Sequence, residues 1–535
     1  MREALIKGMP YGLSNRGNTT MLSQYEMSDC LNIDLTRYGL PTTRGGSSKL
    51  YGTPLESGAM INGGTEFKDY DGFYHIVVAC NGKLFYDQSI DRDTIDIGFA
   101  QLGAGLTLDS DKDTFFSWTT ATENNYSPIL IGTDGENELF GWKGKVDGVY
   151  TDVEEIVSPV SGARAVEWFN NYLLVGNYKI DGIRYASRLC WSDLRSPTTI
   201  SGQDDIFVGS ADDPIVVMTK ALRYIAILKE DSLWRLEINR GATSTYTPAD
   251  TDPVPFVLEH IASGVGCVAP NGAAVYENFV YFQAKDGLYR WDVRGTDEDS
   301  VQKIDTKIDI DNIDWDQVNR VAAVAYPRKG QIRFWIPEEW DDVADKEKSW
   351  FYSIHHHLND DRRRPMLPSF TRNKLKANVC WQGRDIIARN RLPVELPMIF
   401  GDNDNTPYLF VGTYDGYVLK VDTPWYNDYG EAYESYVTTG DLNLNTSRRK
   451  TMNQAHVTAG CPIHQNCDMT ITQYTDFGNI ASAEATFDFT NSGNNKTVDM
   501  ILGGHDRYTK LKFYTYEASH GFSLSSFVVG FDITA

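Results

Sequence analysis

The chain of 535 residues has no run approaching the ~20 consecutive apolar residues that a membrane-spanning helix needs. Its first ten residues lack the apolar segment of a secretory signal peptide. We therefore expect no membrane span and no ordinary secretion. Patterns of the 3.6-residue period that would predict long helices are also hard to find.

Cysteine and basic residues are scarce. Seven cysteines are too few, too scattered and odd in number for a disulfide framework, which favours synthesis in a reducing cytoplasm. Lys and Arg number 50 against 73 Asp and Glu, so the net charge is −23. This balance argues against a domain that reads DNA sequence through a basic face. It suits a surface that repels polyanions, although solubility alone would explain it equally well.

Catalytic motifs are missing too. The sequence contains no sialidase-type Ser-x-Asp-x-Gly-x-x-Trp repeat, no Gly-x-Ser-x-Gly, no His-Glu-x-x-His and no P-loop. The WD40 signature is absent apart from isolated echoes at Trp191 to Asp193 and at Trp291 and Asp292. We expect no enzyme, and we nominate no catalytic, cofactor-binding or metal-binding residue and no cofactor.

What the sequence does contain is a repeated β-hairpin. In residues 278–292 two strands rich in aromatic and β-branched residues flank Asp286 and Gly287. Asp-Gly supplies the positive φ angles of a tight turn. Similar hairpins occur at residues 73–86, 129–142, 172–185, 224–236, 321–335 and 408–421. Successive turns lie roughly 43 to 56 residues apart, and the last interval is about twice as long, which predicts a degenerate blade or an insertion.

This spacing is typical of four-stranded propeller blades, which are roughly 40–50 residues long. Hairpins that cannot bury an apolar face alone can do so when they are stacked around an axis. The sequence therefore predicts an all-β fold with a β-propeller of six to eight blades. A β-sandwich or several small β domains with similar hairpins is the alternative.

Three parts are expected along the chain. Residues 1–60 would form an N-terminal arm and a closing strand, and residues 61–435 the propeller, with an insertion near 337–405. In residues 436–535 six strand-like segments separated by polar loops predict a C-terminal β-sandwich domain.

Several clusters have metal-ligand or phosphate-binding residue types. The acidic segments 109–113, 308–316 and 402–405 fail the EF-hand pattern and are expected to be solvated turns. His355 to His357 are adjacent, so on a strand their side chains point to opposite faces. Arg362 to Arg364 are expected in a solvated loop. Cys461, His464 and Cys467 have no second pair nearby to complete a zinc site.

Two stretches carry a family resemblance. Residues 28–46 combine a Leu-Asn-Ile-Asp strand, a Gly-Leu turn and an Arg-x-Gly stretch. Residues 510–533 combine a polar hairpin around a Gly-Phe pair with a final Gly-Phe-x-Ile strand. Both are similar to the opening and closing strands of podovirus-type bacteriophage tail nozzle or hub proteins.

The resemblance implies a structural virion protein of a phage tail, made in the host bacterial cytoplasm. Such proteins form a homo-oligomeric ring, most often of six copies, whose channel conducts DNA during ejection without sequence recognition. The implied partners are further copies of the chain, the tail adaptor and other tail proteins such as fibres. The alternatives are a host-surface or glycan-binding tail protein and a carbohydrate-active propeller enzyme.

Overall fold

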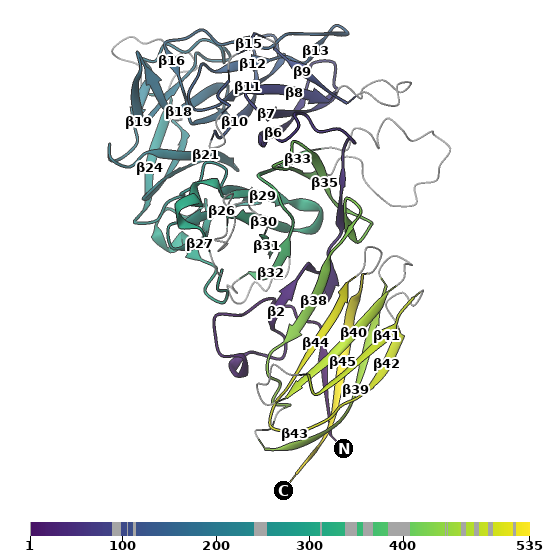
Figure 1. Ribbon diagram of the computed structural model, residues 1–535. Coiled ribbons are helices and arrows are strands. Elements are labelled where there is room, and N and C mark those ends of the chain that lie inside the picture. The colour runs from purple at the N-terminus through teal and green to yellow at the C-terminus, as the bar shows by residue number, and fades with distance from the viewer. Residues whose placement is uncertain are drawn as a thin grey trace.

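The computed structural model describes residues 2–87, 98–103, 105–106, 108–110, 114–239, 254–310, 313–337, 350–356, 368–383, 407–444, 446, 448–461, 467–475, 481–490, 496–516 and 521–534. These residues form an elongated molecule with a propeller at one end and a β-sandwich at the other, and both chain termini lie at the far end of the sandwich (Figure 1). The all-β prediction is confirmed. Among the described residues, helix is confined to short 3₁₀ turns such as η3 (Trp315–Arg320).

Seven sheets of the described chain each contain an antiparallel four-strand meander. The first four comprise β6 (Ile61–Lys68), β7 (Tyr74–Cys80), β8 (Lys83–Asp87) and β9 (Phe99–Leu102); β10 (Ser117–Thr122), β11 (Pro128–Thr133), β12 (Phe140–Trp142) and β15 (Glu154–Glu155); β17 (Ala165–Phe169), β18 (Tyr172–Ile180), β19 (Ile183–Trp191) and β20 (Asp205–Phe207); and β21 (Ile215–Ala221), β22 (Tyr224–Lys229), β23 (Ser232–Ile238) and β24 (Phe256–Ser263). The last three comprise β25 (Ala273–Tyr276), β26 (Phe279–Ala284), β27 (Gly287–Asp292) and β28 (Val301–Lys303); β29 (Ala322–Tyr326), β30 (Gln331–Ile336), β31 (Trp350–His355) and β32 (Ser369–Lys374); and β33 (Val379–Gly383), β34 (Tyr408–Gly412), β35 (Val418–Thr423) and β5 (Gly46–Lys49).

The sheets are arranged as the blades of a closed ring. The first strand of each blade contacts the first strand of the next, in the order β6, β10, β17, β21, β25, β29 and β33, and β33 contacts β6. The outer strand of the last blade is supplied from the N-terminal side, because β5 pairs with β35 with Lys49 opposite Leu419. The propeller thus has seven blades, within the predicted six to eight, and its closure leaves few sheet edges exposed.

The predicted hairpins are strand pairs of these blades. Asn81 and Gly82 have φ values of 51° and 69°, and Asp181 and Gly182 have values of 50° and 77°, as turns with two left-handed residues require. Most of the hairpins join the second and third strands of a blade, whereas the turn before Gly330 joins β29 to β30, the first and second. This difference in strand pair lengthens the interval between the turn before Gly330 and the turn of the last hairpin. The described residues within that interval complete the sixth blade and begin the seventh, and they form no further sheet.

The prediction of an insertion near 337–405 is wrong for those residues of the range that the structure describes. β31, β32 and the first strand β33 of the last blade fall inside this range. Residues 351–355 of β31 are all buried, so the strand has no alternation of polar and apolar residues to reveal it. The remaining residues, 338–349, 357–367 and 384–406, lie outside the described part of the chain, and with them Arg362 to Arg364 and the acidic segment 402–405.

The second body consists of two facing sheets. One contains β3 (Ile33–Leu35), β4 (Pro41–Thr43), β45 (Ser523–Ile533), β39 (Lys450–Gly460) and β42 (Lys496–Ile501), with β1 (Arg2–Lys7) beside β45 and β43 (His505–Asp506) beside β39. The other contains β2 (Met27–Leu31), β38 (Glu434–Thr439), β44 (Thr509–Tyr516), β40 (Asp468–Thr475) and β41 (Ala483–Asp488). Residues expected to form an N-terminal arm thus supply four strands of this sandwich, while β5 closes the propeller.

Strand β39 is the central strand that sequence reasoning missed. It pairs with β45 on one side and with β42 and β43 on the other. A β-bulge between Met452 and Gln454 shifts its register, so the buried residues Met452 and Ala455 stand three positions apart. The bulge therefore breaks the two-residue period by which a half-buried strand is recognised.

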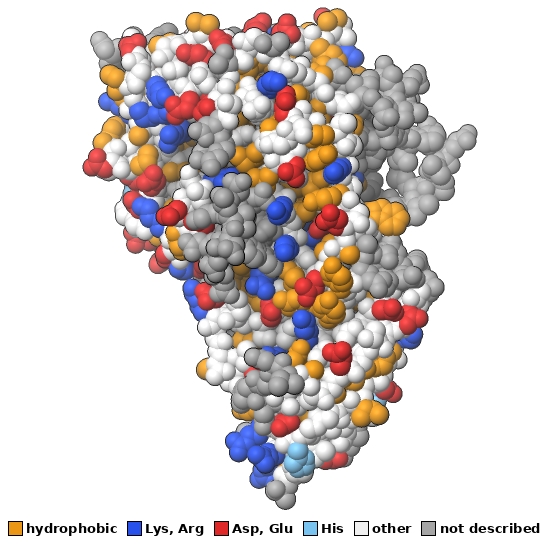
Figure 2. All heavy atoms as spheres, in the orientation of Figure 1, with side chains coloured by type: hydrophobic (Ala, Val, Ile, Leu, Met, Phe, Trp, Pro, Cys, Tyr) orange, Lys and Arg blue, Asp and Glu red, His pale blue; other side chains and the backbone are white. Residues whose placement is uncertain are grey.

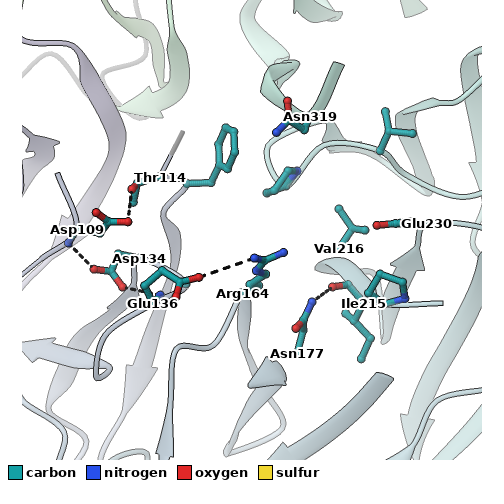
Figure 3. A pocket seen from close by; sticks show the side chains of 15 residues that line it. Asp109, Thr114, Asp134, Glu136, Arg164, Asn177, Ile215, Val216, Glu230 and Asn319 are labelled. Atoms are coloured by element: carbon teal, nitrogen blue, oxygen red, sulfur yellow. Dashed lines mark hydrogen bonds and ion pairs between the residues drawn. The ribbon is translucent and has the colours of Figure 1, made fainter. Parts of the chain in front are cut away.

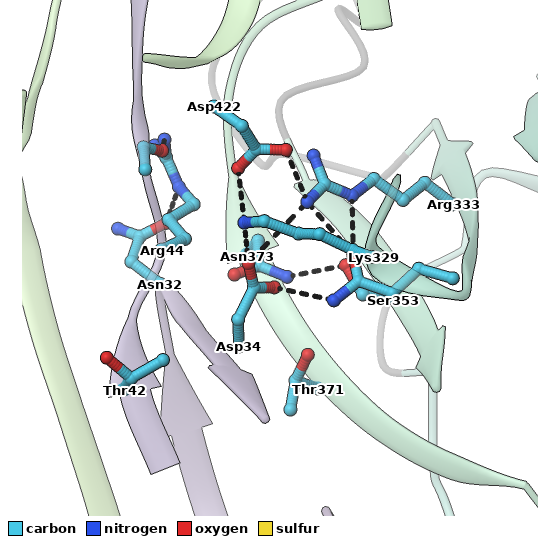
Figure 4. Close-up of polar contacts among 12 residues, drawn as sticks. Asn32, Asp34, Thr42, Arg44, Lys329, Arg333, Ser353, Thr371, Asn373 and Asp422 are labelled. Atoms are coloured by element: carbon cyan, nitrogen blue, oxygen red, sulfur yellow. Dashed lines mark hydrogen bonds and ion pairs between the residues drawn. The ribbon is translucent and has the colours of Figure 1, made fainter. Parts of the chain in front are cut away.

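A largely buried cluster of four charges links the two bodies (Figure 4). Lys329 and Arg333 come from the sixth blade, Asp422 from β35 and Asp34 from β3 of the sandwich. Arg333 Nη2 lies 2.8 Å from Asp422 Oδ2 and 3.6 Å from Asp34 Oδ2. Lys329 Nζ lies 2.8 Å from Asp422 Oδ1 and also pairs with Asp34. Two positive and two negative groups balance one another, which is the arrangement that burial of charge requires.

A second set of polar contacts also joins the sandwich to the propeller. The buried Arg44, between β4 and β5, forms a bidentate pair with Asp428, with Nη1 3.1 Å from Oδ1. Its Nε donates to Asn32 Oδ1 at 2.9 Å, and Nη2 donates to the carbonyl oxygen of Lys374 at 2.8 Å. One guanidinium thus connects Asn32 of the sandwich, Asp428, and Lys374 of the sixth blade.

Candidate functional site

A pocket of about 510 Å³ lies where five blades converge. Residues that immediately precede the inner strands line it: Thr114 and Phe115 before β10, Arg164 before β17, Pro214 before β21, Pro270 before β25 and Asn319 before β29. The turns after β11 and β22 contribute Asp134, Gly135, Glu136 and Glu230. We call it the five-blade pocket. Its volume falls within the range of small-molecule sites, roughly 300–1,000 Å³.

Two of its carboxylates are engaged in holding the wall (Figure 3). Asp134 accepts hydrogen bonds from the backbone amides of Asp109, Glu136 and Asn137 at 2.8, 3.0 and 2.8 Å. Asp109 accepts one from Thr114 Oγ1 at 2.9 Å. Asp109 was expected in a solvated turn, but it is half-buried and shapes the pocket. Residues 111–113 of the same segment lie outside the described part of the chain.

The third carboxylate, Glu136, is surrounded by cations. Its oxygens lie 2.6 Å from Lys179 Nζ, 3.3 Å from Arg184 Nη2 and 3.8 Å from Arg164 Nη2. Arg184 also donates to the carbonyl oxygens of Gly135 and Gly162 at 2.9 and 2.6 Å, so it fixes the turn that carries Glu136. Burial, and then the neighbouring Arg164, lower the pKa of Arg184.

Three other polar side chains are differently placed. Arg164, Asn319 and Glu230 come from three blades and lie on three sides of the open centre of the pocket (Figure 3). Within the described chain, the Glu230 carboxylate and the Asn319 amide make no hydrogen bond or ion pair, and Arg164 has only the 3.8 Å pair with Glu136. Their hydrogen-bonding groups are therefore available to a ligand.

Outside the pocket lining, Glu167 of β17 lies on the inner ring of strands. Its carboxylate accepts hydrogen bonds from Thr119 Oγ1 of β10 at 3.2 Å and from the backbone amide of Lys220 of β21 at 3.2 Å. It thus connects three neighbouring blades. Burial raises the pKa of Glu167 to about 7, against the opposing effect of these hydrogen bonds.

The histidines considered as metal ligands have other roles where the structure describes them. His355 is buried and lies 2.9 Å from Thr371 Oγ1, while His356 Nδ1 lies 2.6 Å from the hydroxyl of Tyr281. His357 lies outside the described residues. In the segment 308–316, Asp314 is fully buried and accepts a hydrogen bond from the amide of Asp316, so it caps η3 and is not solvated as expected.

Cys461 and Cys467 are brought together, whereas His464 between them lies outside the described residues. Both cysteines are buried and carry free thiols. A hydrogen bond with Cys467 lowers the pKa of Cys461. Among the described residues no three Asp, Glu, His or Cys side chains are grouped as a metal ion would need. The same residues include no helix long and apolar enough to cross a membrane.

Comparison with known proteins identifies no family. No family model matches the chain, and no curated protein matches it. Among solved structures, the chain is similar to BBS1N in complex with ARL6DN, with 12% identity and a TM-score of 0.40 over 71% of this chain and 98% of that one. It is also similar to an exo-β-1,3-galactanase from Phanerochaete chrysosporium, with 8% identity and a TM-score of 0.25 over 91% of this chain and 100% of that one. Likeness at this level says nothing about activity.

Proposed function

We propose that this chain is a structural subunit of a podovirus-type phage tail, in which several copies form a nozzle or hub ring that conducts DNA. The observation that carries the proposal concerns the two stretches that resemble such proteins. Residues 28–46 include β3 and β4 and nearly all of β2, and residues 510–533 include β45 and nearly all of β44. β2 and β44 both pair with β38, and Thr42 of β4 pairs with Ser523 of β45. The resemblance thus concerns one folded unit.

The charge of the chain suits passage of DNA. With a net charge of −23, copies arranged around a channel would repel phosphates and would not hold them by the counterion release that drives DNA binding. In this proposal the protein acts by assembly, without a cofactor or a catalytic step. It is made in the host cytoplasm and resides in the virion, beside the adaptor and fibre proteins.

A ring needs a surface that contacts an unlike surface of the next copy. The tip of the sandwich offers one, because Lys and Arg side chains gather there on an otherwise mixed surface (Figure 2). Arg448, Arg449 and Arg507 are exposed in this region. The buried Lys450 donates to the carbonyl oxygens of Arg448 and Arg507, at 3.1 Å for Arg448, and thereby holds the two turns together. We call these arginines the basic tip, and the acidic surface of a neighbouring copy is its complement.

The test is the assembled mass of the purified protein, measured by native mass spectrometry, together with electron microscopy of isolated tails. We expect a ring of six copies with an axial hole. A chain that stays monomeric even with adaptor and fibre proteins present would overturn the proposal. Solution at high salt serves as a control, because contacts of the basic tip weaken once charges are screened.

A further inference from the structure

The five-blade pocket carries charges of both signs. Its lining includes the carboxylates of Asp109, Asp134, Glu136 and Glu230, and the hydrogen bonds that hold Asp109 and Asp134 do not remove their charge. Arg164 belongs to the same lining, Lys179 and Arg184 pair with Glu136, and Lys285 interacts electrostatically with Glu230. A ligand with a net charge of either sign would therefore be repelled by some of these groups. The pocket therefore suits a ligand without net charge.

The available groups also suit a ligand that both donates and accepts hydrogen bonds. Arg164 can only donate, the Glu230 carboxylate can only accept, and the Asn319 amide can do both. A hydroxyl group is likewise both donor and acceptor, so a molecule with several hydroxyls can satisfy all three side chains at once. These three side chains belong to the third, fourth and sixth blades, so their groups approach the ligand from different directions.

Apolar side chains complete the lining. The lining also contains Phe115, Pro214, Val216, Val268 and Pro270. Such a surface packs against the C–H faces of a ring while polar groups fix its orientation. An alternation of C–H faces and hydroxyls is the chemistry of a saccharide, and the volume of about 510 Å³ is that of a small-molecule site.

We propose that the five-blade pocket binds a neutral saccharide, with Arg164, Glu230 and Asn319 as the residues that contact its hydroxyls. This inference does not depend on ring formation, since every residue that it uses belongs to one chain. It gives the chain a recognition function in addition to the proposed structural one. No turnover is implied.

Binding can be measured by saturation-transfer NMR and calorimetry on the full chain. The probes are glucose, galactose, mannose, maltose and lactose, with glucuronic acid and glucosamine as acidic and basic comparisons. We expect at least one neutral saccharide to bind, and the two charged sugars to bind more weakly than it does. Preferred binding of either charged sugar, or no binding of the neutral saccharides up to their solubility, would overturn the inference.

Variants locate the site. Glu230→Ala and Asn319→Ala each remove an exposed side chain that makes no hydrogen bond or ion pair within the described protein, so we expect folding to be unaffected and saccharide affinity to fall about tenfold. Glu298→Ala, at an exposed position in η2 (Glu298–Ser300), is the matched control and should bind as the wild type does. Unchanged affinity in both pocket variants would place the saccharide elsewhere and refute the assignment. Assembly, measured separately by native mass spectrometry, should not change in any of the three.

Discussion

Replacing Asp422 with Asn tests whether the charge cluster between the two bodies stabilises the protein. The side chain of Asp422 is 3% exposed and that of Arg333 is fully buried, so solvent cannot compensate for a lost charge. In Asp422→Asn only Asp34 would remain to balance Lys329 and Arg333. Breaking a buried pair on one side typically costs about 3–5 kcal/mol. We expect about 3 kcal/mol here, because Asp34 remains and Lys329 is partly exposed.

The assay is thermal and urea unfolding of Asp422→Asn beside Asp415→Asn, an exposed aspartate in the hairpin of the same blade. An unfolding entropy of about 2 cal/mol/K per residue makes 3 kcal/mol equivalent to about 3 °C if all 535 residues unfold together, and to a larger shift if one body melts alone. Asp415→Asn should change neither transition. A double-mutant cycle with Arg333→Met should give a coupling of about 1–3 kcal/mol. Equal stability of the two Asn variants, or strict additivity in the cycle, would refute the reasoning.

The same cluster predicts a dependence on pH. Burial alone would raise the pKa of Asp34, but Lys329, Arg333 and His355 together hold it below its usual range. A carboxyl whose pKa is lower in the folded state stabilises the protein above its unfolded value and loses that effect as the pH falls through the folded one. The wild type should therefore lose stability below about pH 4, and Asp422→Asn should alter that loss, because the charges around Asp34 change.

Three more predictions concern other sites. Because the pKa of Glu167 is raised to about 7, its ionisation destabilises the fold as the pH rises from the pKa of the unfolded state through 7. In thermal unfolding, Glu167→Gln should have the same Tm as the wild type at pH 5 and a higher Tm at pH 8. An equal difference in Tm at both pH values would contradict this prediction. A Cβ on Gly64 would lie 2.4 Å from the ring of Trp381, where the first and last blades meet. Gly64→Ala should therefore lower the free energy of unfolding in urea by about 1–3 kcal/mol. An unchanged midpoint of the urea transition would contradict this prediction and show that the contact adapts. Reversing Arg448 and Arg449 to Glu should lower the fraction of ring in native mass spectra; an undiminished ring would exclude the basic tip from the interface.

The propeller could be predicted from local sequence because each blade repeats a hairpin whose turn needs particular residues. Asn81 and Gly82 or Asp181 and Gly182 can adopt left-handed φ values that most other residues avoid. The blade number could only be bracketed. The turn before Gly330 joins different strands from the others, and the buried strand β31 has no periodic pattern.

The five-blade pocket could not be predicted, since its residues share no motif. Arg164, Glu230 and Asn319 lie in separate connections and meet only when the ring closes. Even Asp109, in a segment that the sequence singled out, was assigned to solvent because its EF-hand pattern failed. Its actual role depends on the hydrogen bond that it accepts from Thr114 and on the hydrogen bond that its backbone amide donates to the carboxylate of Asp134, which lies 25 positions away. Long-range closure of this kind leaves no signal in a single sequence.

The pairing of the first and last strands has a consequence for biosynthesis. β5 can complete the seventh blade only after β35 has been made, and β1 pairs with β45 at the very end of the chain. On the ribosome, therefore, the propeller cannot close before β35 emerges, and the sandwich cannot be finished before β45 emerges, so the early strands must wait with unpaired edges. Contacts of such sequence separation make folding slow. Once made, however, these pairs hold β1 beside β45 and β5 beside β35, so that opening either body requires breaking pairs between strands far apart in the sequence.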